Sequence, residues 1–231
     1  MSNDSITLLG SWASPFVLRA RFALNLKNLP YKFLEETAGA KSELLLKSNP
    51  IHQKIPVLIH DGKPICESLL IVQYIDEGWT SGPAILPPDL STRYAHRFWA
   101  DYVDSKLFPD VRDAIKTSNF EEEIAKVERA REALVPLEEA YQNMSNDKGF
   151  FGGESIGYLD IALGSMLGWV TALHVTSGIE ILNNDKMPGL CNWAEAFCAH
   201  AAVQSVMPKT DAFVQFAKIL REKLKQLRSK S

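Results

Sequence analysis

The sequence predicts a small α/β domain followed by an all-helical domain. Two observations support this division: strand-like runs occur only before residue 67, and helical periodicity fills the later part of the chain. Between these parts, residues 78–88 contain three prolines and two glycines, which disfavour a continuing helix or strand. We therefore expect domains at 1–81 and 91–231, joined by a linker at 82–90.

The first domain begins with a βαβ unit. Residues 6–9 are a short β-type run, residues 15–27 carry apolar side chains at helical spacing, and residues 31–35 alternate as in a strand. The helix should bury one face. Residues 41–48 follow as a short polar connector that is helical or irregular.

A ββα unit completes this domain. From Lys54 to Ser68 the sequence reads as an Ile-Pro turn, a short apolar strand, an Asp-Gly hairpin, a second strand and a helix start. The helix should run over about 67–77. This order brings a free backbone edge, a lysine and a helix N-terminus to one small space, which suits an extended anionic peptide.

The second domain shows only helical patterns. The predicted helices cover roughly 91–117, 121–144, 158–176, 189–200 and 209–228. The third of these has no consistently polar face, so it should be the central buried helix. Pro136 lies inside an otherwise periodic run and should kink or split its helix, because proline lacks a backbone donor.

Composition argues against several functional classes. The formal charge of -3 gives no global field that would favour nucleic acid or an anionic membrane, and no apolar run approaches membrane-spanning length. The three cysteines show no C-x-x-C spacing, and the histidines show no metal-binding spacing. No dinucleotide or ATP motif occurs. We expect a cytoplasmic protein without a metal, a nucleic-acid partner or a membrane partner.

Ser14-Pro15 stands at the start of the first helix, where unpaired N–H groups and partial positive charge are concentrated. In the simplest interpretation Ser14 is an N-cap and Pro15 is the first helical residue. A functional interpretation adds a second use. The Ser14 hydroxyl would donate a hydrogen bond to a ligand thiolate, and the helix dipole would favour that anion.

Glu67-Ser68 has the same ambiguity, because a serine at a helix start is usually only a cap. The pair could instead hold an amino-acid head group, with Ser68 and the helix amides on the carboxylate and Glu67 on the ammonium. Ile55-Pro56 is an ordinary turn unless its peptide bond is cis. In that case the Ile55 backbone could pair with a bound peptide as an added strand.

Lysines and aromatic residues complete the candidate set. Lys54 and Lys41 could meet a carboxylate at the other end of the peptide, although a single lysine is more often solvated surface. Most aromatic side chains belong to the core by default. Trp12 is the exception, since it lies in a polar turn directly before Ser14 and could wall an apolar pocket beside the thiol.

Taken together, these motifs resemble those of the glutathione transferases, and most closely the plant tau class. The resemblance is carried by Trp-Ala-Ser-Pro-Phe at 12–16, Lys-Ile-Pro-Val-Leu at 54–58, Cys-Glu-Ser and the helix after it at 66–77, and Gly-Tyr-Leu-Asp-Ile-Ala at 157–162. It implies a thioredoxin-like N-terminal domain, an all-helical C-terminal domain and a homodimer. It also implies that glutathione is the co-substrate.

The resemblance assigns roles to individual residues. The serine that matches Ser14 activates the glutathione thiol in such enzymes. The residues expected to bind the tripeptide are Lys41, Lys54, Ile55, Pro56, Glu67 and Ser68. The pocket for the second substrate would draw on Ser11, Trp12, Phe16, Phe108, Arg112, Trp169, Phe213 and Phe216.

The chain departs from the usual family pattern at three positions. Gln53 stands where a second lysine is frequent, so the glycyl end of the peptide site should be less cationic. Ser11 stands where an aromatic residue is frequent, so the hydrophobic pocket should be roomier. Gly157 replaces the Ser or Thr of a capping box with Asp160, and this cap should be weakened rather than lost.

Three functions fit these residues. The leading hypothesis is conjugation of glutathione to small hydrophobic electrophiles, as in detoxification and stress response. The first alternative is glutathione-dependent reduction of organic hydroperoxides, which needs the same activated thiol. The second is a non-catalytic carrier that holds ligands in the aromatic pocket. A thiol transferase is disfavoured, because a mixed disulfide would need cysteine at position 14.

Overall fold

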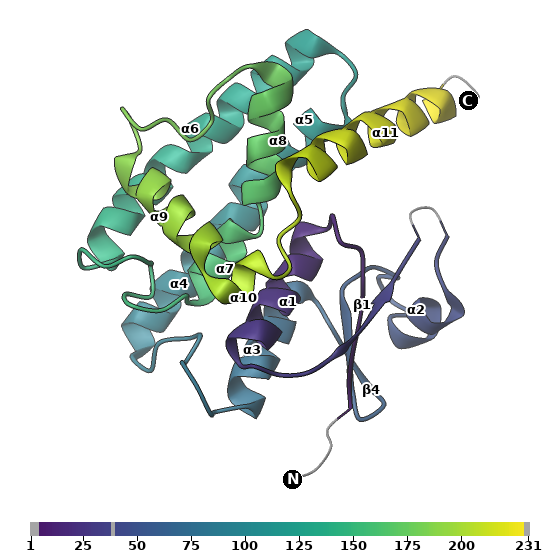
Figure 1. The fold of residues 1–231 in the computed structure, drawn as a ribbon, viewed down its shortest axis with the longest axis vertical. Coiled ribbons are helices and arrows are strands. Elements are labelled where there is room, and N and C mark those ends of the chain that lie inside the picture. The colour runs from purple at the N-terminus through teal and green to yellow at the C-terminus, as the bar shows by residue number, and fades with distance from the viewer. Residues whose placement is uncertain (1–4, 38–39, 229–231) are drawn as a thin grey trace.

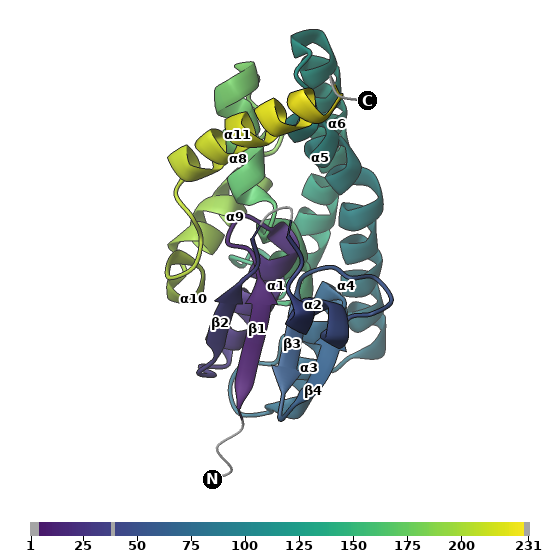
Figure 2. The ribbon, with the colours of Figure 1, turned by 90° about the vertical axis from the view of Figure 1, so that its right-hand side faces the viewer.

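The computed structural model describes residues 5–37 and 40–228 and contains a four-stranded sheet with a helical region beside it (Figure 1). The strands are β1 (Ile6–Gly10), β2 (Lys32–Glu35), β3 (Val57–His60) and β4 (Lys63–Cys66), in the order β2-β1-β3-β4. β1 runs parallel to β2, while β3 is antiparallel to both β1 and β4. Figure 2 shows this strand order face-on. Both predicted units of the first domain are therefore present.

Alternation along the strands divides the apolar residues between the two faces of the sheet. Leu8 pairs with Leu58, and both lie in the main core with the helices α1 (Pro15–Leu26) and α3 (Ser68–Gly78). The next residues of the same ladder, Leu9 and Val57, form a smaller cluster with Leu45. Leu45 belongs to the short helix α2 (Glu43–Ser48), so α2 covers the opposite face.

The linker is fixed by a carboxylate that is 11% exposed. Asp76 accepts hydrogen bonds from the backbone N–H groups of Ile85 and Leu86, both at 2.9 Å, and pairs with the Nζ atom of Lys27 at 2.8 Å. No helix or strand lies between Gly78 and the next helix, which begins at Leu90. The exact domain limits at 81 and 90 remain predictions.

The second part of the chain is helical. Its elements are α4 (Leu90–Tyr102), a π-helical turn (Val103–Leu107), α5 (Phe108–Lys116), α6 (Phe120–Met144), α7 (Tyr158–Gly164), α8 (Leu167–Ser177), α9 (Pro188–Ala199), α10 (Ala201–Gln204) and α11 (Thr210–Arg228). The predicted helix at 91–117 thus contains a π turn before Pro109, because proline cannot donate the hydrogen bond that a regular helix needs there.

Two expectations for this region need correction. Pro136 does not split its helix, since α6 continues from Phe120 to Met144, while the expected alternative of a kink stays a prediction. The missing hydrogen bond is offset by packing along one face of α6, where Val127, Leu134 and Leu137 are buried. Conversely, the predicted single helix at 158–176 is divided into α7 and α8.

The central position of α7 is confirmed, because every residue of this helix is buried. The expectation that no apolar run approaches membrane-spanning length is wrong, because residues 158–177 are long and apolar enough to cross a membrane by length and composition. However, 72% of that window is buried inside the protein. This burial assigns the segment to the helical core.

Gly157 has no side chain to cap α7, and Asp160 forms a network of hydrogen bonds at the start of this helix instead. Its fully buried carboxylate accepts backbone hydrogen bonds from Phe151 at 2.9 Å, Gly152 at 3.2 Å and Gly157 at 2.8 Å. The indole Nε1 of Trp193 donates a fourth, at 2.7 Å. Burial raises the pKa of Asp160 to about 6, while the N–H donors oppose that rise.

Candidate functional site

Ser14 caps the first helix, and its hydroxyl keeps its capacity to donate a hydrogen bond. Its Oγ accepts a hydrogen bond from the Val17 N–H at 3.4 Å, and Pro15 opens the helix. Within the described part of the chain, the Ser14 hydroxyl donates no hydrogen bond. Next to it, the Ala13 carbonyl accepts a 2.8 Å hydrogen bond from the Trp169 indole. Ser14 therefore has the simple capping role, and its hydroxyl hydrogen remains able to donate.

Two adjoining cavities lie where the peptide site was predicted. One, of about 240 Å³, is lined by the start of α3 and the turn before β3, together with Phe16 and Asp104. The other, of about 410 Å³, is lined by Lys41, Gln53 and their neighbours. The two cavities share Lys54 and Ile55. Ser14 is not among the residues that line either one.

The six predicted peptide-binding residues all border these cavities. Ile55, Pro56, Glu67 and Ser68 line the smaller one, Lys41 lines the larger one, and Lys54 lines both. The Ile55-Pro56 bond is cis. Among residues 5–37 and 40–228, nothing forms a hydrogen bond with the N–H or C=O of Ile55, so this backbone edge is available to a peptide.

Glu67 holds an unusual backbone conformation. Its φ of 68° is in the left-handed region, which costs a residue with a Cβ about 1 to 3 kcal/mol. The side chain makes no capping hydrogen bond to α3, and its Oε1 atom lies 3.8 Å from the Nε2 atom of His52. Its carboxylate is thus free to meet a cation from a ligand.

Sequence analysis missed Arg19 and Asp104, which support the smaller cavity from beneath. Arg19 is fully buried and donates to both carboxylate oxygens of Asp104, at 2.9 and 2.5 Å. It also donates to the Ser68 hydroxyl at 3.4 Å and to the Ser165 hydroxyl at 3.2 Å. An arginine on the buried face of a helix was the available signal, since such a charge requires partners.

At the other end, Lys41 donates a hydrogen bond to the Gln53 side-chain oxygen at 3.2 Å. The neutral Gln53 therefore positions the lysine amine rather than adding a second charge. Ser11 also lines this larger cavity. Its expected place in the pocket for the second substrate stays a prediction.

The other predicted pocket residues form two aromatic groups. Phe16 stacks edge-on against Phe108 with ring centroids 4.8 Å apart, and the Arg112 guanidinium lies 5.8 Å from the Phe108 ring. Trp12 and Trp169 both contact Phe213 and Phe216, at centroid distances between 5.0 and 5.9 Å.

Phe213 and Trp169 are poor candidates for direct ligand contact in this conformation, since they are 0% and 4% exposed. Their predicted place in the pocket wall is therefore a supporting one. Trp12 and Phe216 are half-buried and can still face a ligand.

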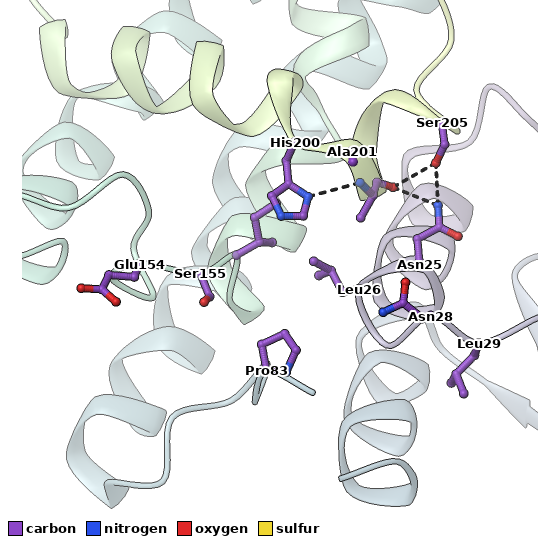
Figure 3. A pocket seen from close by; sticks show the side chains of 12 residues that line it. Asn25, Leu26, Asn28, Leu29, Pro83, Glu154, Ser155, His200, Ala201 and Ser205 are labelled. Carbon is purple, nitrogen blue, oxygen red and sulfur yellow. Dashed lines mark hydrogen bonds between the residues drawn. The ribbon is translucent and has the colours of Figure 1, made fainter. Parts of the chain in front are cut away.

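A further groove, of about 440 Å³, lies at the far end of α1 (Figure 3). The Asn25 amide there donates to the Ala202 carbonyl at 2.9 Å and to the Ser205 hydroxyl at 3.0 Å. These bonds tie α1 to α10. The groove is separated from Ser14 by the length of α1, and it shares no lining residue with the two peptide cavities.

The cysteine beside the site is not activated. Cys66 precedes Glu67, and burial raises the pKa of its thiol, with a further rise from the Glu67 charge. It is therefore protonated at neutral pH and a weak nucleophile. In the described ranges, no three His, Cys, Asp or Glu side chains gather as a metal site would require.

Comparison with known proteins identifies the family. The model of the glutathione S-transferase N-terminal domain matches residues 8–78, and that of the C-terminal domain matches residues 98–201. Glutathione S-transferase U17 of Arabidopsis thaliana is 50% identical over 219 residues, covering 94% of this chain and 96% of the relative. The chain belongs to the glutathione S-transferase family.

Solved structures of this family superpose closely on the chain. The tau class glutathione S-transferase of mango, Mangifera indica L., is 53% identical with a TM-score of 0.89, covering 94% of this chain and 98% of its own. Rice GST1, solved in complex with glutathione, is 34% identical with a TM-score of 0.86, covering 96% and 99%. The predicted family, tau class and two-part fold are confirmed, and the protein is a transferase.

Proposed function

We propose that this glutathione S-transferase joins the sulfur of reduced glutathione to hydrophobic electrophiles, with Ser14 as the donor that stabilises the thiolate. The observation that carries this proposal is the free donor capacity of Ser14 at the N-terminus of α1. The rice relative was solved with glutathione, which supports the same ligand here.

Glutathione would lie across the two adjoining cavities. Its γ-glutamyl carboxylate would meet Ser68 and the first N–H groups of α3, and its ammonium would meet Glu67 and Asp104. The cysteinyl backbone would pair with Ile55. The glycyl carboxylate would lie toward Lys41 and Lys54.

The energy that Ser14 has to supply is moderate. A free thiol titrates near pH ~8.5, and lowering its pKa by two units requires about 2.7 kcal/mol of differential stabilisation. One charge-assisted hydrogen bond contributes about 1.5 to 3 kcal/mol, and the helix dipole adds about 0.3 to 1 kcal/mol. The site therefore needs no separate general base. The resulting thiolate attacks the electrophilic carbon, forms a C–S bond and displaces the leaving group.

Replacement of Ser14 by alanine tests this role. Ser14→Ala should lower kcat with 1-chloro-2,4-dinitrobenzene by about 100-fold, which corresponds to the loss of one strong hydrogen bond to the thiolate, while KM for glutathione changes little. Ser81→Ala, at an exposed serine between α3 and α4, serves as the control and should retain the wild-type turnover. Unchanged activity in Ser14→Ala would show that another group stabilises the thiolate.

We also propose a homodimer that uses the exposed faces of α3 and α4. Five large apolar side chains lie at least one third exposed there, namely Leu70, Tyr74, Leu90, Tyr94 and Phe98. On α4 they recur every four residues, which forms a stripe suited to a second helical surface. Light scattering on a size-exclusion column should give twice the chain mass, and Tyr94→Glu with Phe98→Glu should give the single mass.

A cytoplasmic location and a role in detoxification or stress response complete the proposal. All three cysteines are free, which suits a reducing compartment. Imaging of a fluorescent fusion would test the location, and growth of a knockout line on toxic electrophiles would test the role.

A further inference from the structure

Helix α11 connects the aromatic residues near Ser14 with a distant polar junction. At its start, Phe213 and Phe216 lie 5.8 and 5.4 Å from the Trp12 ring. Trp12 stands two residues before Ser14. The position of α11 therefore sets how closely the half-buried Phe216 covers Trp12. Figure 2 shows α11 crossing the upper part of the molecule, above the sheet and α1.

The first turns of α11 are held by close packing on α8. Phe213 is fully buried, and a Cβ added to Gly168 would lie 2.2 Å from its ring. Ala217, one turn farther along the same face, is buried as well. The opposite face of α11 carries exposed residues such as Lys218. This contact fixes the start of the helix and leaves its later turns to other interactions.

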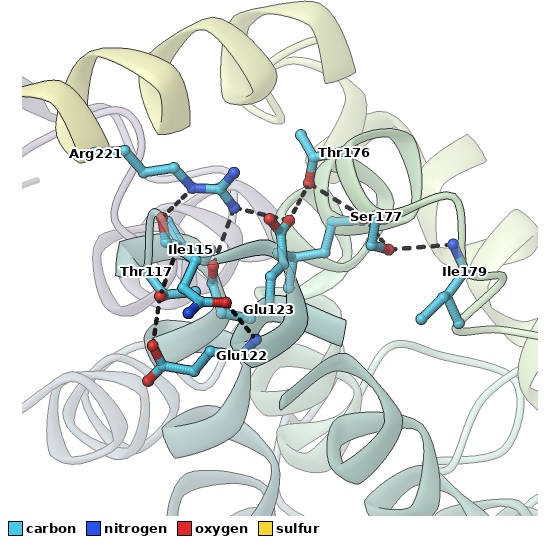
Figure 4. A network of polar contacts seen from close by, with 11 residues as sticks. Ile115, Thr117, Glu122, Glu123, Thr176, Ser177, Ile179 and Arg221 are labelled. Atoms are coloured by element: carbon cyan, nitrogen blue, oxygen red, sulfur yellow. Dashed lines mark hydrogen bonds and ion pairs between the residues drawn. The ribbon is translucent and has the colours of Figure 1, made fainter. Parts of the chain in front are cut away.

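Arg221 supplies such an interaction, as Figure 4 shows. Its Nε donates to the Ile115 carbonyl at 2.9 Å, and its Nη2 donates to the Ala114 carbonyl at 3.0 Å. Nη2 also pairs with the Glu123 carboxylate at 2.8 Å, and the two side chains are only 18% and 5% exposed.

These partners suit a guanidinium group. The two carbonyls lie in the last turn of α5, where they lack helical N–H partners and where the helix dipole is negative. Glu123, in the first turn of α6, also accepts a 2.6 Å hydrogen bond from Thr176 near the end of α8. One arginine thus joins α11 to the ends of α5, α6 and α8. Without Arg221, the buried Glu123 carboxylate would keep the Thr176 hydroxyl but lose its paired positive charge.

The geometry points to Arg221 as a positioning residue for the electrophile site. It fastens the later part of α11 to the junction of α5, α6 and α8, and thereby keeps Phe216 over Trp12. The kinetic side of this inference rests on the proposed function. Release of Arg221 would loosen the aromatic cover and weaken electrophile binding. Glutathione binding should be spared, because α11 packs on α8 and α5 rather than on the β3–α3 region.

The test compares Arg221→Met with Lys218→Met. Both remove one positive charge and keep an unbranched side chain in the same helix, but Lys218 is exposed. In Arg221→Met, KM for 1-chloro-2,4-dinitrobenzene should rise about fivefold or more, with KM for glutathione within about twofold of wild type. Hydrogen exchange of the α11 amides should become about tenfold faster, while α7 stays protected.

Two further variants test whether the contacts of Arg221 themselves cause these effects. Arg221→Lys keeps the charge but not the planar fork of donors, so it should recover part of the α11 protection. Glu123→Gln weakens the same junction from the other side and should raise the electrophile KM in the same direction. It also serves if Arg221→Met does not fold.

Several outcomes would overturn the inference. One is an electrophile KM in Arg221→Met equal to that of Lys218→Met. Another is an equal rise in both KM values with faster exchange throughout the protein, which would show a general structural role. If the wild-type protein conjugates nothing, the proposed function fails. Faster hydrogen exchange confined to the α11 amides in Arg221→Met would still show that Arg221 holds α11 in place.

Discussion

Arg19 donates two hydrogen bonds to Asp104 across the boundary between the α/β part and the helical part of the chain, at 2.9 and 2.5 Å. The arginine comes from α1, and the aspartate comes from the π-helical turn. Ser68, Ser165 and the Ala162 carbonyl accept the other hydrogen bonds of Arg19. One buried cation therefore orders the floor of the smaller cavity, where we propose that glutathione binds. This pair connects the stability of the fold with ligand binding.

Arg19→Leu should lower both stability and glutathione affinity. The change leaves Asp104 and Ser68 without their donor, and we expect the free energy of unfolding to fall by about 3 kcal/mol. Urea unfolding measures this loss, and KM for glutathione should rise at the same time. Arg21→Leu is the matched control in the same helix. Arg21 is half-buried, donates to the Tyr31 hydroxyl at 3.2 Å and lies over the Phe33 ring at 4.7 Å, so its loss should cost only about 1 kcal/mol. Equal losses would contradict the central role of Arg19.

Glu67→Gly should separate stability from binding. Glycine adopts a φ of 68° without steric cost, so the variant should be more stable by about 1 kcal/mol. Glutathione should nevertheless bind more weakly, because the carboxylate is lost. Glu67→Gln keeps the Cβ and its backbone strain, so it should lose affinity without gaining stability. Isothermal titration calorimetry with glutathione and thermal unfolding of the two variants check both effects. Tighter glutathione binding in either variant would contradict the role assigned to Glu67.

Gly168→Ala should disturb α11. The new Cβ would overlap the buried Phe213 ring, and overpacking of this kind costs about 1 to 3 kcal/mol. Differential scanning calorimetry should show a lower melting temperature. Gly149→Ala provides the contrast, because no atom lies within 4 Å of the added Cβ and its stability should change little. A Gly168→Ala protein as stable as wild type would show that α11 shifts away without cost.

His96 should make the protein sensitive to mild acid. It is 1% exposed, neither ring nitrogen has a hydrogen-bond partner within the described ranges, and burial lowers its pKa from 6.5 to about 4. The unfolded chain therefore binds this proton below about pH 6.5, while the folded protein binds it only near pH 4. Stability due to His96 is complete above pH 6.5 and is lost as the pH falls toward 4.

The His96 effect can be isolated by difference. Asp160 acts in the opposite direction, since its pKa is raised to about 6 and its ionisation costs stability as the pH rises from 3.8 to 6. The curve of wild type minus His96→Leu cancels that contribution. It should decline by up to about 3 kcal/mol between pH 6.5 and 4 in denaturant titrations. A flat difference curve would mean that His96 is not held neutral.

Local patterns were enough to predict most of the fold. Alternation identified the strands, the Asp61-Gly62 pair identified the hairpin, and helical periodicity located the bundle. The errors arose where tertiary contacts compete with local signals. Pro136 is a local signal for a break, but the packing of α6 keeps the helix continuous. At Ser165 no local signal indicates the break between α7 and α8.

The site followed the same division. Motif spacing placed Lys54, Ile55, Glu67 and Ser68 around one cavity, because they are close in sequence. Asp104 lies far along the chain, and only the folded structure brings it under Ser68 through Arg19. The local sequence likewise does not predict how deeply an aromatic side chain is buried. Phe213 was expected in the pocket wall, but its side chain is fully buried.

The hydrogen bond from the Trp169 indole to the Ala13 carbonyl has a consequence for protein engineering. It holds the main chain beside Ser14 from the helical half of the molecule. A chimera that takes this half from another family member also exchanges the group that holds the turn before Ser14. If Ser14 acts on the sulfur as we propose, selectivity for the acceptor and reactivity of the sulfur are inherited together. A graft must then transfer both sides of this contact to keep them matched.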